Sequence, residues 1–213
     1  RSSGAEITSN APFSVDVKKI KFNYPNSNFG LKNIDFHINP KEKIAIVGNN
    51  GAGKTTLVKL LVGLYDSCEG TIEYNGKDIR DYNILSLRNR IGVAYQNTNA
   101  YALPFKNNLS IYSTAPEKKV EDIVASLKLD QVLEKASASI DTEMTKEFDS
   151  NGIVVSGGEL QKIGIGRIMM SNFGLLILDE PSASLDPIAE ADLANVLFSE
   201  SNKTTTIIIS HRL

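Results

Sequence analysis

The pattern of apolar and polar positions in the first third of the chain predicts strands that are buried on one side. Residues 15–22 and 34–38 alternate apolar with polar side chains, as half-buried strands do. A short apolar run at 43–47 predicts a third strand, and glycines follow it directly. Leucines at helical spacing then predict a helix over 55–64, with Gly63 as its stop signal.

The rest of the chain continues to alternate between strands and helices. Residues 71–74 predict a strand that enters a tight turn at Asn75-Gly76. The stretch from 96 to about 155 is different, because it shows helical faces but no strong strand pattern. The alternation as a whole predicts an α/β fold with a mainly parallel sheet. Further strands are predicted at 91–95, 175–178 and 204–209, and further helices at 85–88, 117–129, 131–136 and 187–199.

The same pattern predicts how the chain is organised. Residues 1–14 are small and polar, and we expect them to be a linker or tail. Residues 15–213 form one domain in this interpretation. A helical subdomain is expected as an insert at about 97–172.

Composition and charge narrow the function classes mainly by exclusion. The chain has 213 residues and a formal net charge of −2, which disfavours a strongly nucleic-acid-binding surface. Cys68 is the one cysteine, so no internal disulfide can form and a reducing compartment fits. No apolar run approaches the roughly 20 residues of a bilayer span. A membrane role would therefore come through another polypeptide or a further part of the chain.

Residues 48–55 read Gly-Asn-Asn-Gly-Ala-Gly-Lys-Thr, which is the complete phosphate-loop pattern between a predicted strand and a predicted helix. Small residues let backbone N–H groups turn around an anion, and the helix start points its positive dipole end at the phosphates. Lys54 adds a full positive charge, and the Thr55 hydroxyl can bind Mg²⁺. The expected nucleotide-binding residues of this segment are Gly48, Asn49, Asn50, Gly51, Ala52, Gly53, Lys54, Thr55 and Thr56.

Two carboxylates follow the apolar strand predicted at 175–178. Because ligands bind at the carboxyl ends of strands in open parallel sheets, we expect Asp179 and Glu180 beside the phosphates. Asp179 is the candidate Mg²⁺ ligand, either directly or through water. Glu180 is the candidate that orients or deprotonates an attacking water. The alternative is a strand that merely exits into solvent with two acidic residues, and the phosphate loop weakens it.

The segment 155–162 reads Val-Ser-Gly-Gly-Glu-Leu-Gln-Lys and resembles the signature of the ATP-binding-cassette (ABC) ATPases, usually Leu-Ser-Gly-Gly-Gln. The resemblance covers roughly residues 15–213. Further positions match in the family's order: Tyr24 resembles the adenine-stacking aromatic, Gln96 the Gln-loop residue, residues 183–186 the D-loop, and His211 the switch histidine.

The signature segment also has a local interpretation. Ser156 and Glu159 have the spacing of a capping box at a helix start. Both interpretations can hold together, because a capped helix start with two glycines presents N–H groups to an incoming phosphate. The signature residues that the resemblance places on a partner's nucleotide are Ser156, Gly157, Gly158 and Glu159.

The resemblance implies a P-loop NTPase fold with an N-terminal antiparallel β subdomain, a parallel core sheet and an inserted α-helical subdomain. It implies an ATPase that uses ATP and Mg²⁺, in which two cassettes pack head to tail around two nucleotides. Tyr24 would stack on adenine, and Asp186 would line the nucleotide site. The catalytic residues that it implies are Glu180, His211, Gln96 and Lys54, and the implied metal ligands are Thr55, Gln96 and Asp179.

The segments 87–93 and 210–213 resemble those of exporter cassettes, and 145–152 loosely resembles the segment before the signature in exporters. The resemblance is strongest to exporters of bacterial peptides or antibiotics. The phosphate loop and the signature are too close for the long coiled coil of chromosome-maintenance relatives, and one phosphate loop disfavours tandem relatives. The expected partners are a transmembrane domain of the same full-length chain and a second nucleotide-binding domain, with no nucleic acid. The expected location is the cytoplasmic face of the cell membrane. The family continues past the position of His211, so we expect the domain to extend beyond residue 213.

Three departures from the family pattern keep alternatives open. Val155 replaces the usual Leu, Glu159 replaces the usual Gln, and Ala183-Ser184 inverts the usual order of the D-loop. A non-catalytic module that dimerises around ATP is therefore one alternative, and an importer ATPase is another. A soluble phosphate-loop kinase or GTPase is disfavoured, because the signature-like segment is present and no Asn-Lys-x-Asp guanine motif occurs.

Overall fold

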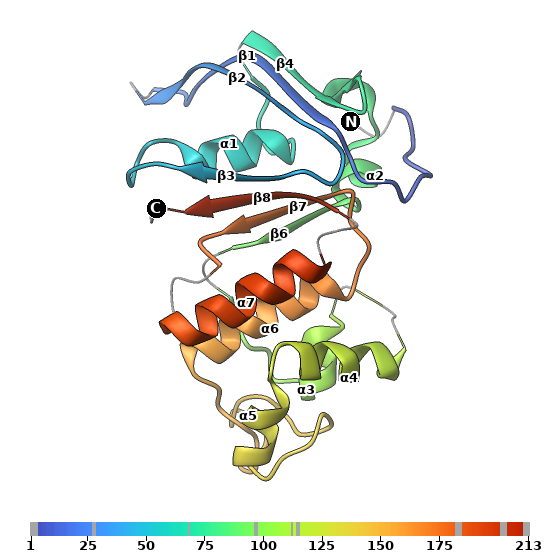
Figure 1. Ribbon diagram of the computed structural model, residues 1–213, viewed down its shortest axis with the longest axis vertical. Coiled ribbons are helices and arrows are strands. Elements are labelled where there is room, and N and C mark those ends of the chain that lie inside the picture. The colour runs from blue at the N-terminus through green and yellow to red at the C-terminus, as the bar shows by residue number, and fades with distance from the viewer. Residues whose placement is uncertain are drawn as a thin grey trace. The chain divides into compact units, whose positions relative to one another are not determined.

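The computed structural model describes residues 4–26, 29–67, 69–95, 98–111, 113, 116–181, 185–200 and 204–210. Contacts divide the chain into two compact units, whose elements are labelled in Figure 1. The first unit is built from the described residues of 1–93, 173–179 and 201–213. The second unit is built from those of 94–172 and 180–200.

The first unit contains a four-stranded antiparallel sheet. β1 pairs antiparallel with β2 on one side and with β4 on the other, and β4 pairs with β5. The strands are β1 (Val15–Asn23), β2 (Gly30–Ile38), β4 (Glu69–Tyr74) and β5 (Lys77–Asp78), in the order β2-β1-β4-β5.

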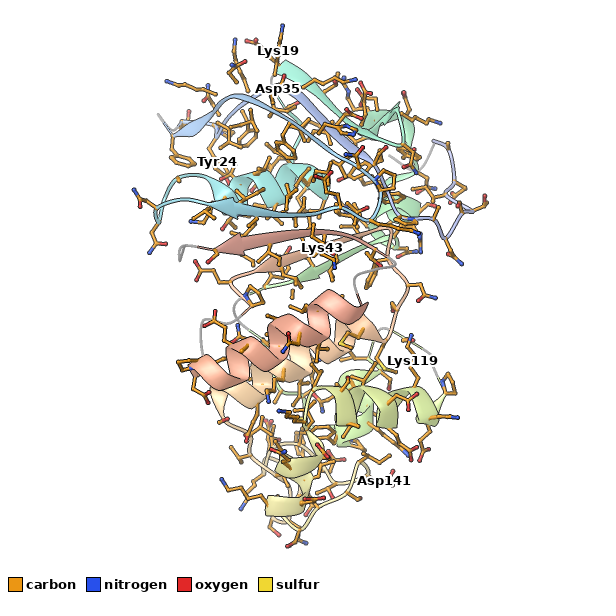
Figure 2. The ribbon with its side chains drawn as sticks, in the orientation of Figure 1. Lys19, Tyr24, Asp35, Lys43, Lys119 and Asp141 are labelled. Atoms are coloured by element: carbon orange, nitrogen blue, oxygen red, sulfur yellow. The ribbon has the colours of Figure 1, made fainter. Side chains whose placement is uncertain are left out.

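A bulge in β1 explains why its apolar series changes from odd to even positions. Val17 and Ile20 are both fully buried, although they do not share the two-residue period of a strand. The pairing register shifts between them, and Lys19 has a left-handed backbone with φ of 49°. The Asp35 carboxylate accepts a hydrogen bond from the Lys19 N–H over 3.2 Å, and Figure 2 labels both residues. The bulge keeps both halves of the apolar series on the core side.

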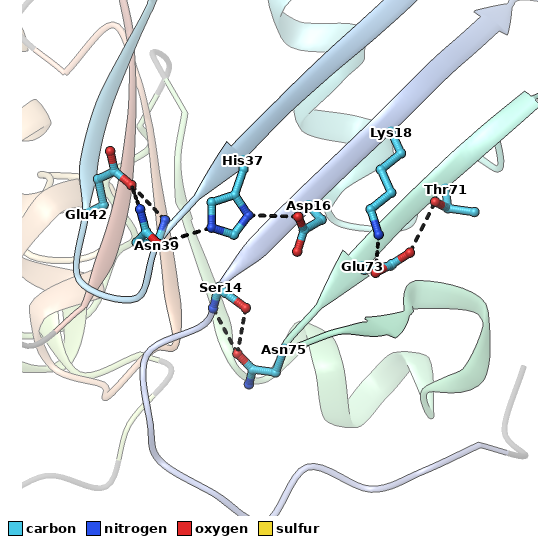
Figure 3. A network of polar contacts seen from close by, with 9 residues as sticks. All are labelled: Ser14, Asp16, Lys18, His37, Asn39, Glu42, Thr71, Glu73 and Asn75. Atoms are coloured by element: carbon cyan, nitrogen blue, oxygen red, sulfur yellow. Dashed lines mark hydrogen bonds and ion pairs between the residues drawn. The ribbon is translucent and has the colours of Figure 1, made fainter.

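A tight turn joins β4 to β5, as the Asn75-Gly76 pair predicts. Both residues have positive φ, 51° and 75°, which is the backbone of a type I′ hairpin turn. The Asn75 side chain accepts a hydrogen bond from the Ser14 N–H over 2.8 Å (Figure 3). This contact fixes the turn to the start of β1.

A second sheet and a helix complete the core of this unit. β8 pairs parallel with both β3 and β7. In Figure 1, helix α1 (Lys54–Leu61) lies between this sheet and the antiparallel one, and apolar side chains of all three share one core. The predicted α/β class, with a parallel core sheet and an antiparallel β subdomain, is confirmed. The remaining elements are β3 (Lys43–Val47), β8 (Thr205–Ser210), β7 (Leu175–Asp179) and β6 (Ile91–Ala94) in sheet order, with η1 (Ile79–Asp81) and α2 (Ile84–Arg88).

The segment before β1 packs against the first unit. Phe13 is 1% exposed, and its N–H donates to the carbonyl of Gly174 over 2.9 Å. Its ring lies 5.2 Å from the ring of Tyr74, centroid to centroid. The polar composition of residues 1–14 predicts a linker, but one aromatic side chain supplies enough apolar area to anchor the end of this segment.

Helices dominate the second unit. α6 contacts both α3 and α4. The helices predicted within 117–129, 131–136 and 187–199 are confirmed, whereas α3 has only five residues and therefore no periodic pattern. Among the described helices, none is long and apolar enough to cross a membrane. The helices of this unit are α3 (Phe105–Leu109), α4 (Glu117–Ser126), α5 (Asp130–Lys135), α6 (Gly157–Met169) and α7 (Pro187–Glu200).

A buried arginine ties α6 to the segment that precedes α3. Arg167 is 7% exposed, and its guanidinium donates to the carbonyl oxygens of Asn99 and Asn108, each over 2.7 Å. The guanidinium also lies over the Tyr101 ring, 5.0 Å from its centroid. The Asn108 side chain is buried as well and donates to the Tyr101 carbonyl over 2.9 Å. These contacts give the segment a fixed place on α6.

Candidate nucleotide site

The phosphate loop runs from the end of β3 to the start of α1. Gly51 has φ of 81° and Gly53 has φ of 100°, conformations that glycine adopts without the clash of a Cβ. A Cβ on Gly53 would lie 2.5 Å from Leu31 Cδ2, so the loop is packed tightly against β2 at this point. No described side chain caps the start of α1, which leaves its N–H groups suited to an anion.

The side chain of Lys54 turns back over the phosphate loop. Its Nζ donates to the carbonyl oxygens of Gly48 and Asn49, over 2.5 and 3.1 Å. The loop therefore holds the ammonium group close to the backbone that would surround a phosphate. A full positive charge at this place can neutralise phosphate oxygens.

The two threonines after Lys54 differ in their surroundings. Thr55 is exposed at the helix start, where its hydroxyl is accessible to a metal ion. Thr56 is only 5% exposed, and its hydroxyl lies 3.2 Å from the hydroxyl of Tyr24. Thr55 is thus exposed to solvent, whereas the hydroxyl of Thr56 is in contact with Tyr24.

Tyr24 belongs to a cluster of aromatic side chains and is labelled in Figure 2. Its ring meets those of Phe22 and Tyr65 edge-on, at centroid separations of 4.9 and 5.5 Å. Phe29 stacks with Tyr24 at 6.3 Å and lies against the phosphate loop, 3.5 Å from the place of a Cβ on Gly53. Planar aromatic surface therefore borders the loop, as the stacking of a base requires.

Asp179 lies at the same end of the parallel sheet as the phosphate loop. In the strand register, Asp179 of β7 pairs with Ile209 of β8, and Ile209 pairs with Ile46 of β3. Asp179 is thus level with a residue two positions before Gly48, across two strand spacings of roughly 10 Å in total. The carboxylate that the sequence assigns to Mg²⁺ shares a sheet edge with the loop that the sequence assigns to phosphate.

Glu180 has an unusual backbone and a specific support. Its φ is 50°, a left-handed conformation that residues with a Cβ seldom adopt. Gln161 of α6 is 4% exposed, and its side-chain Nε2 donates to the Glu180 carbonyl oxygen over 2.8 Å. Sequence patterns assign no role to Gln161, because the two residues are 19 positions apart and no local pattern connects them.

The signature segment forms the capping box that its spacing predicts. The Ser156 side chain accepts from the Glu159 N–H over 3.3 Å, and the Glu159 carboxylate accepts from the Ser156 N–H over 2.7 Å. α6 begins directly after Ser156. A Cβ on Gly157 would meet nothing within 4 Å, so the described part of the chain leaves space above this helix start.

Several predicted site residues fall beyond what the structure describes. Gln96 and His211, which the family resemblance places at the γ-phosphate, lie outside the described residues, and so does Ala183-Ser184. Asp186 is described and exposed, and its carbonyl accepts the Glu190 N–H at the start of α7 over 2.9 Å.

The donor set of the first unit fits a magnesium-bound triphosphate. It combines uncapped helix N–H groups, the Lys54 ammonium, the Thr55 hydroxyl and the Asp179 carboxylate. Mg²⁺ takes few protein ligands and shares its remaining positions with phosphate and water oxygens. One hydroxyl and one carboxylate are therefore a sufficient contribution from the chain.

Comparison with known proteins gives one consistent result. The family described as ABC transporter matches residues 31–183. The subtilin transport ATP-binding protein SpaT of Bacillus subtilis is 37% identical over 94% of this chain. The ATP-dependent lipid A-core flippase of Pectobacterium atrosepticum is 31% identical over the whole chain. The structure of a bacterial Atm1-family ABC exporter with ATP bound is similar over 99% of this chain, with a TM-score of 0.84 and 28% identity.

The chain spans only about a third of the length of these proteins. It covers 33% of the subtilin transport protein, 36% of the flippase and 37% of the Atm1-family exporter. The similarity therefore concerns one domain of larger proteins.

Proposed function

The chain belongs to the ABC transporter family, and on that premise we propose that it binds ATP with Mg²⁺ and hydrolyses it to drive export across a membrane. One observation carries the proposal: the phosphate loop, with Lys54 folded over it, shares a sheet edge with Asp179. The exporter assignment draws further support from relatives whose names describe transport of subtilin and flipping of lipid A-core.

Each residue has a defined task in this reaction. The N–H groups of residues 48–55 and the Lys54 ammonium bind the phosphates and offset the charge that develops on them during transfer. Tyr24 stacks on the base. Glu180 accepts the proton of the attacking water, so that the oxygen can attack the terminal phosphorus.

Thr55 and Asp179 would hold Mg²⁺, the first by its hydroxyl and the second by its carboxylate. Bound there, the ion would supply positive charge that offsets the negative charge of the phosphates. Gln96 and His211 join this group in the proposal on the strength of the family resemblance.

A second cassette completes the site. Ser156 and the glycines after it would contact the terminal phosphate of a nucleotide held by the partner, which makes ATP the link between two chains. The helix start at Ser156 has the N–H groups for this contact. The two cassettes would lie at the cytoplasmic face of the membrane. A transmembrane domain of the longer protein would couple their closing and opening to transport.

Two substitutions test the proposal in this chain. Glu180→Gln should lower phosphate release at least about 100-fold, because general-base catalysis is worth roughly 10²–10⁴ in rate, while ATP binding persists. Size-exclusion chromatography should then show an ATP-dependent dimer. Lys54→Met should abolish ATP binding itself. Glu134→Gln and Lys135→Met, exposed on α5, are matched controls and should retain the wild-type rate.

Each result has a distinct meaning. Unchanged hydrolysis by Glu180→Gln would exclude Glu180 as the base. ATP-dependent dimerisation of the wild type without phosphate release would establish the non-catalytic module instead. Strong preference for GTP over ATP in competition would contradict the ABC assignment of the site.

A further inference from the structure

The contact between Gln161 and Glu180 is a specific hydrogen bond rather than incidental packing. A carbonyl oxygen only accepts hydrogen bonds, so the NH₂ end of the Gln161 amide must face it. The distance is 2.8 Å and Gln161 is 4% exposed. Water cannot readily replace this donor at a buried place, so its loss leaves the carbonyl without that partner.

The peptide unit that receives this hydrogen bond has only one polar group. Residue 181 is proline, which has no N–H. The carbonyl oxygen of Glu180 is therefore the only atom of the Glu180–Pro181 peptide unit that can take part in a hydrogen bond. The φ of 50° at Glu180 is strained for a residue with a Cβ, and such a conformation persists only where its surroundings hold it.

Backbone conformation decides where the Glu180 carboxylate points. A change of φ from 50° to the ordinary negative range would rotate the Cα–Cβ direction relative to the preceding strand residue, Asp179. A general base must lie within hydrogen-bond reach of the water that it activates. A relaxed backbone would therefore change where the carboxylate points, and in the proposed function that change would slow proton transfer from the attacking water.

We propose that Gln161 is a positioning residue for hydrolysis: its side-chain amide holds the left-handed backbone of Glu180 and thereby aims the carboxylate. The proposal rests on the role of Glu180 in the proposed function. It also assigns a task to α6 beyond its start at Ser156, because the same helix carries the donor.

Gln161→Leu tests this role, since leucine has a similar size but no donor. We expect kcat for ATP hydrolysis to fall at least about 10-fold, with KM and the Kd for ATP within about twofold of the wild type. Gln131→Leu, an exposed glutamine on α5, is the matched control and should leave both constants unchanged. Unaltered kcat in Gln161→Leu would overturn the proposal, and so would parallel losses in kcat and ATP affinity.

Gln161→Glu provides a second test, which remains informative even if the leucine variant folds poorly. A carboxylate at this place cannot donate, whereas a protonated carboxyl group can, and burial favours the protonated form. We expect the kcat of Gln161→Glu relative to the wild type to recover severalfold as the pH falls from about 8 to about 6. A ratio independent of pH would contradict the hydrogen-bond role.

Failure of this inference can be told apart from failure of the proposed function. If Glu180→Gln is inactive but Gln161→Leu is fully active, Glu180 is the base and Gln161 does not position it. If Glu180→Gln is fully active, the base itself is wrongly assigned.

Discussion

The hydroxyl groups of Tyr24 and Thr56 lie 3.2 Å apart, which joins the end of β1 to the first turn of α1. The ring of Tyr24 is held by its aromatic neighbours, and its hydroxyl is held by Thr56. Both constraints come from contacts within the first unit. They hold the proposed stacking surface in a defined place, and a surface held in this way loses little conformational entropy when it binds a ligand.

Substitutions of Tyr24 should distinguish the contribution of its ring to ATP binding from the contribution of its hydroxyl to stability. Tyr24→Phe keeps the stacking surface and should leave the Kd for ATP within about threefold, while the lost hydrogen bond lowers the free energy of unfolding by about 1 kcal/mol. Tyr24→Leu removes the ring and should weaken ATP binding about 10-fold or more, since stacking on a base is worth roughly 1–3 kcal/mol. Isothermal titration calorimetry measures both affinities.

Inorganic tripolyphosphate provides the control for Tyr24, because it has no base. Its affinity should be the same in the wild type, Tyr24→Phe and Tyr24→Leu. An equal loss of tripolyphosphate binding in Tyr24→Leu would mean that the ring only supports the loop.

Two glycines of the phosphate loop should differ in their tolerance of alanine. Gly51→Ala meets no atom within 4 Å and should cost only the strain of a left-handed alanine, about 1–2 kcal/mol. Gly53→Ala adds a Cβ at 2.5 Å from Leu31 Cδ2 and should destabilise the fold more. Urea denaturation measures both losses. Combining Gly53→Ala with Leu31→Val should recover part of the difference, and equal losses in both alanine variants would contradict the packing argument.

Glu159 should weaken the proposed ATP-dependent dimer through its charge. Its carboxylate accepts the Ser156 N–H at the helix start that would meet the partner's phosphate. Glu159→Gln keeps an acceptor but removes the negative charge, so we expect severalfold tighter ATP-dependent dimerisation, measured by analytical ultracentrifugation in the Glu180→Gln background. Glu159→Ala lacks the acceptor and should lower the free energy of unfolding by about 1 kcal/mol. Weaker dimerisation of Glu159→Gln would show that the carboxylate assists contact.

His37 should make the stability of the antiparallel sheet depend on pH. Its Nδ1 lies 2.7 Å from Asp16 Oδ1 and its Nε2 lies 3.2 Å from Asn39 Oδ1 (Figure 3). Hydrogen bonding to Asp16, and then to Asn39, raises the pKa of His37 above its ordinary value of 6.5. The contribution to stability is fully present below the unfolded pKa and is lost as the pH rises through the higher folded pKa.

Urea midpoints at about pH 6 and about pH 9 test this dependence. The wild type should lose more stability between these pH values than His37→Gln, and Asp16→Asn should behave like His37→Gln because it removes the main partner. NMR titration of the His37 ring should give a pKa above 6.5 in the wild type. A pKa at or below that value would contradict the argument.

Strands and the phosphate loop could be predicted because each follows from a local pattern. The alternation in β1 and the Asn75-Gly76 turn both express preferences of a few neighbouring residues. The capping box at Ser156 is likewise a relation over three positions and is confirmed.

Features that depend on distant contacts could not be predicted. The composition of residues 1–14 predicts a linker that includes Phe13, because composition describes the neighbours of Phe13 and not the core that its side chain enters. α3 is too short for periodicity, and its place is fixed by Arg167, far along the chain. The assignment of Thr56 to the nucleotide stays a prediction, although the structure places its hydroxyl beside Tyr24. Gln161 was missed because its partner is a backbone carbonyl, which no residue type reveals.

The guanidinium of Arg167 has a consequence for how the second unit can move. This group keeps its charge at every physiological pH, and its main acceptors are carbonyl oxygens of the segment before and within α3. If the segment shifted alone, a permanent cation would be left in the interior without these acceptors, at a high energetic cost. Any displacement of residues 99–108 must therefore be accompanied by a matching displacement of α6, so that the two segments move as one rigid piece.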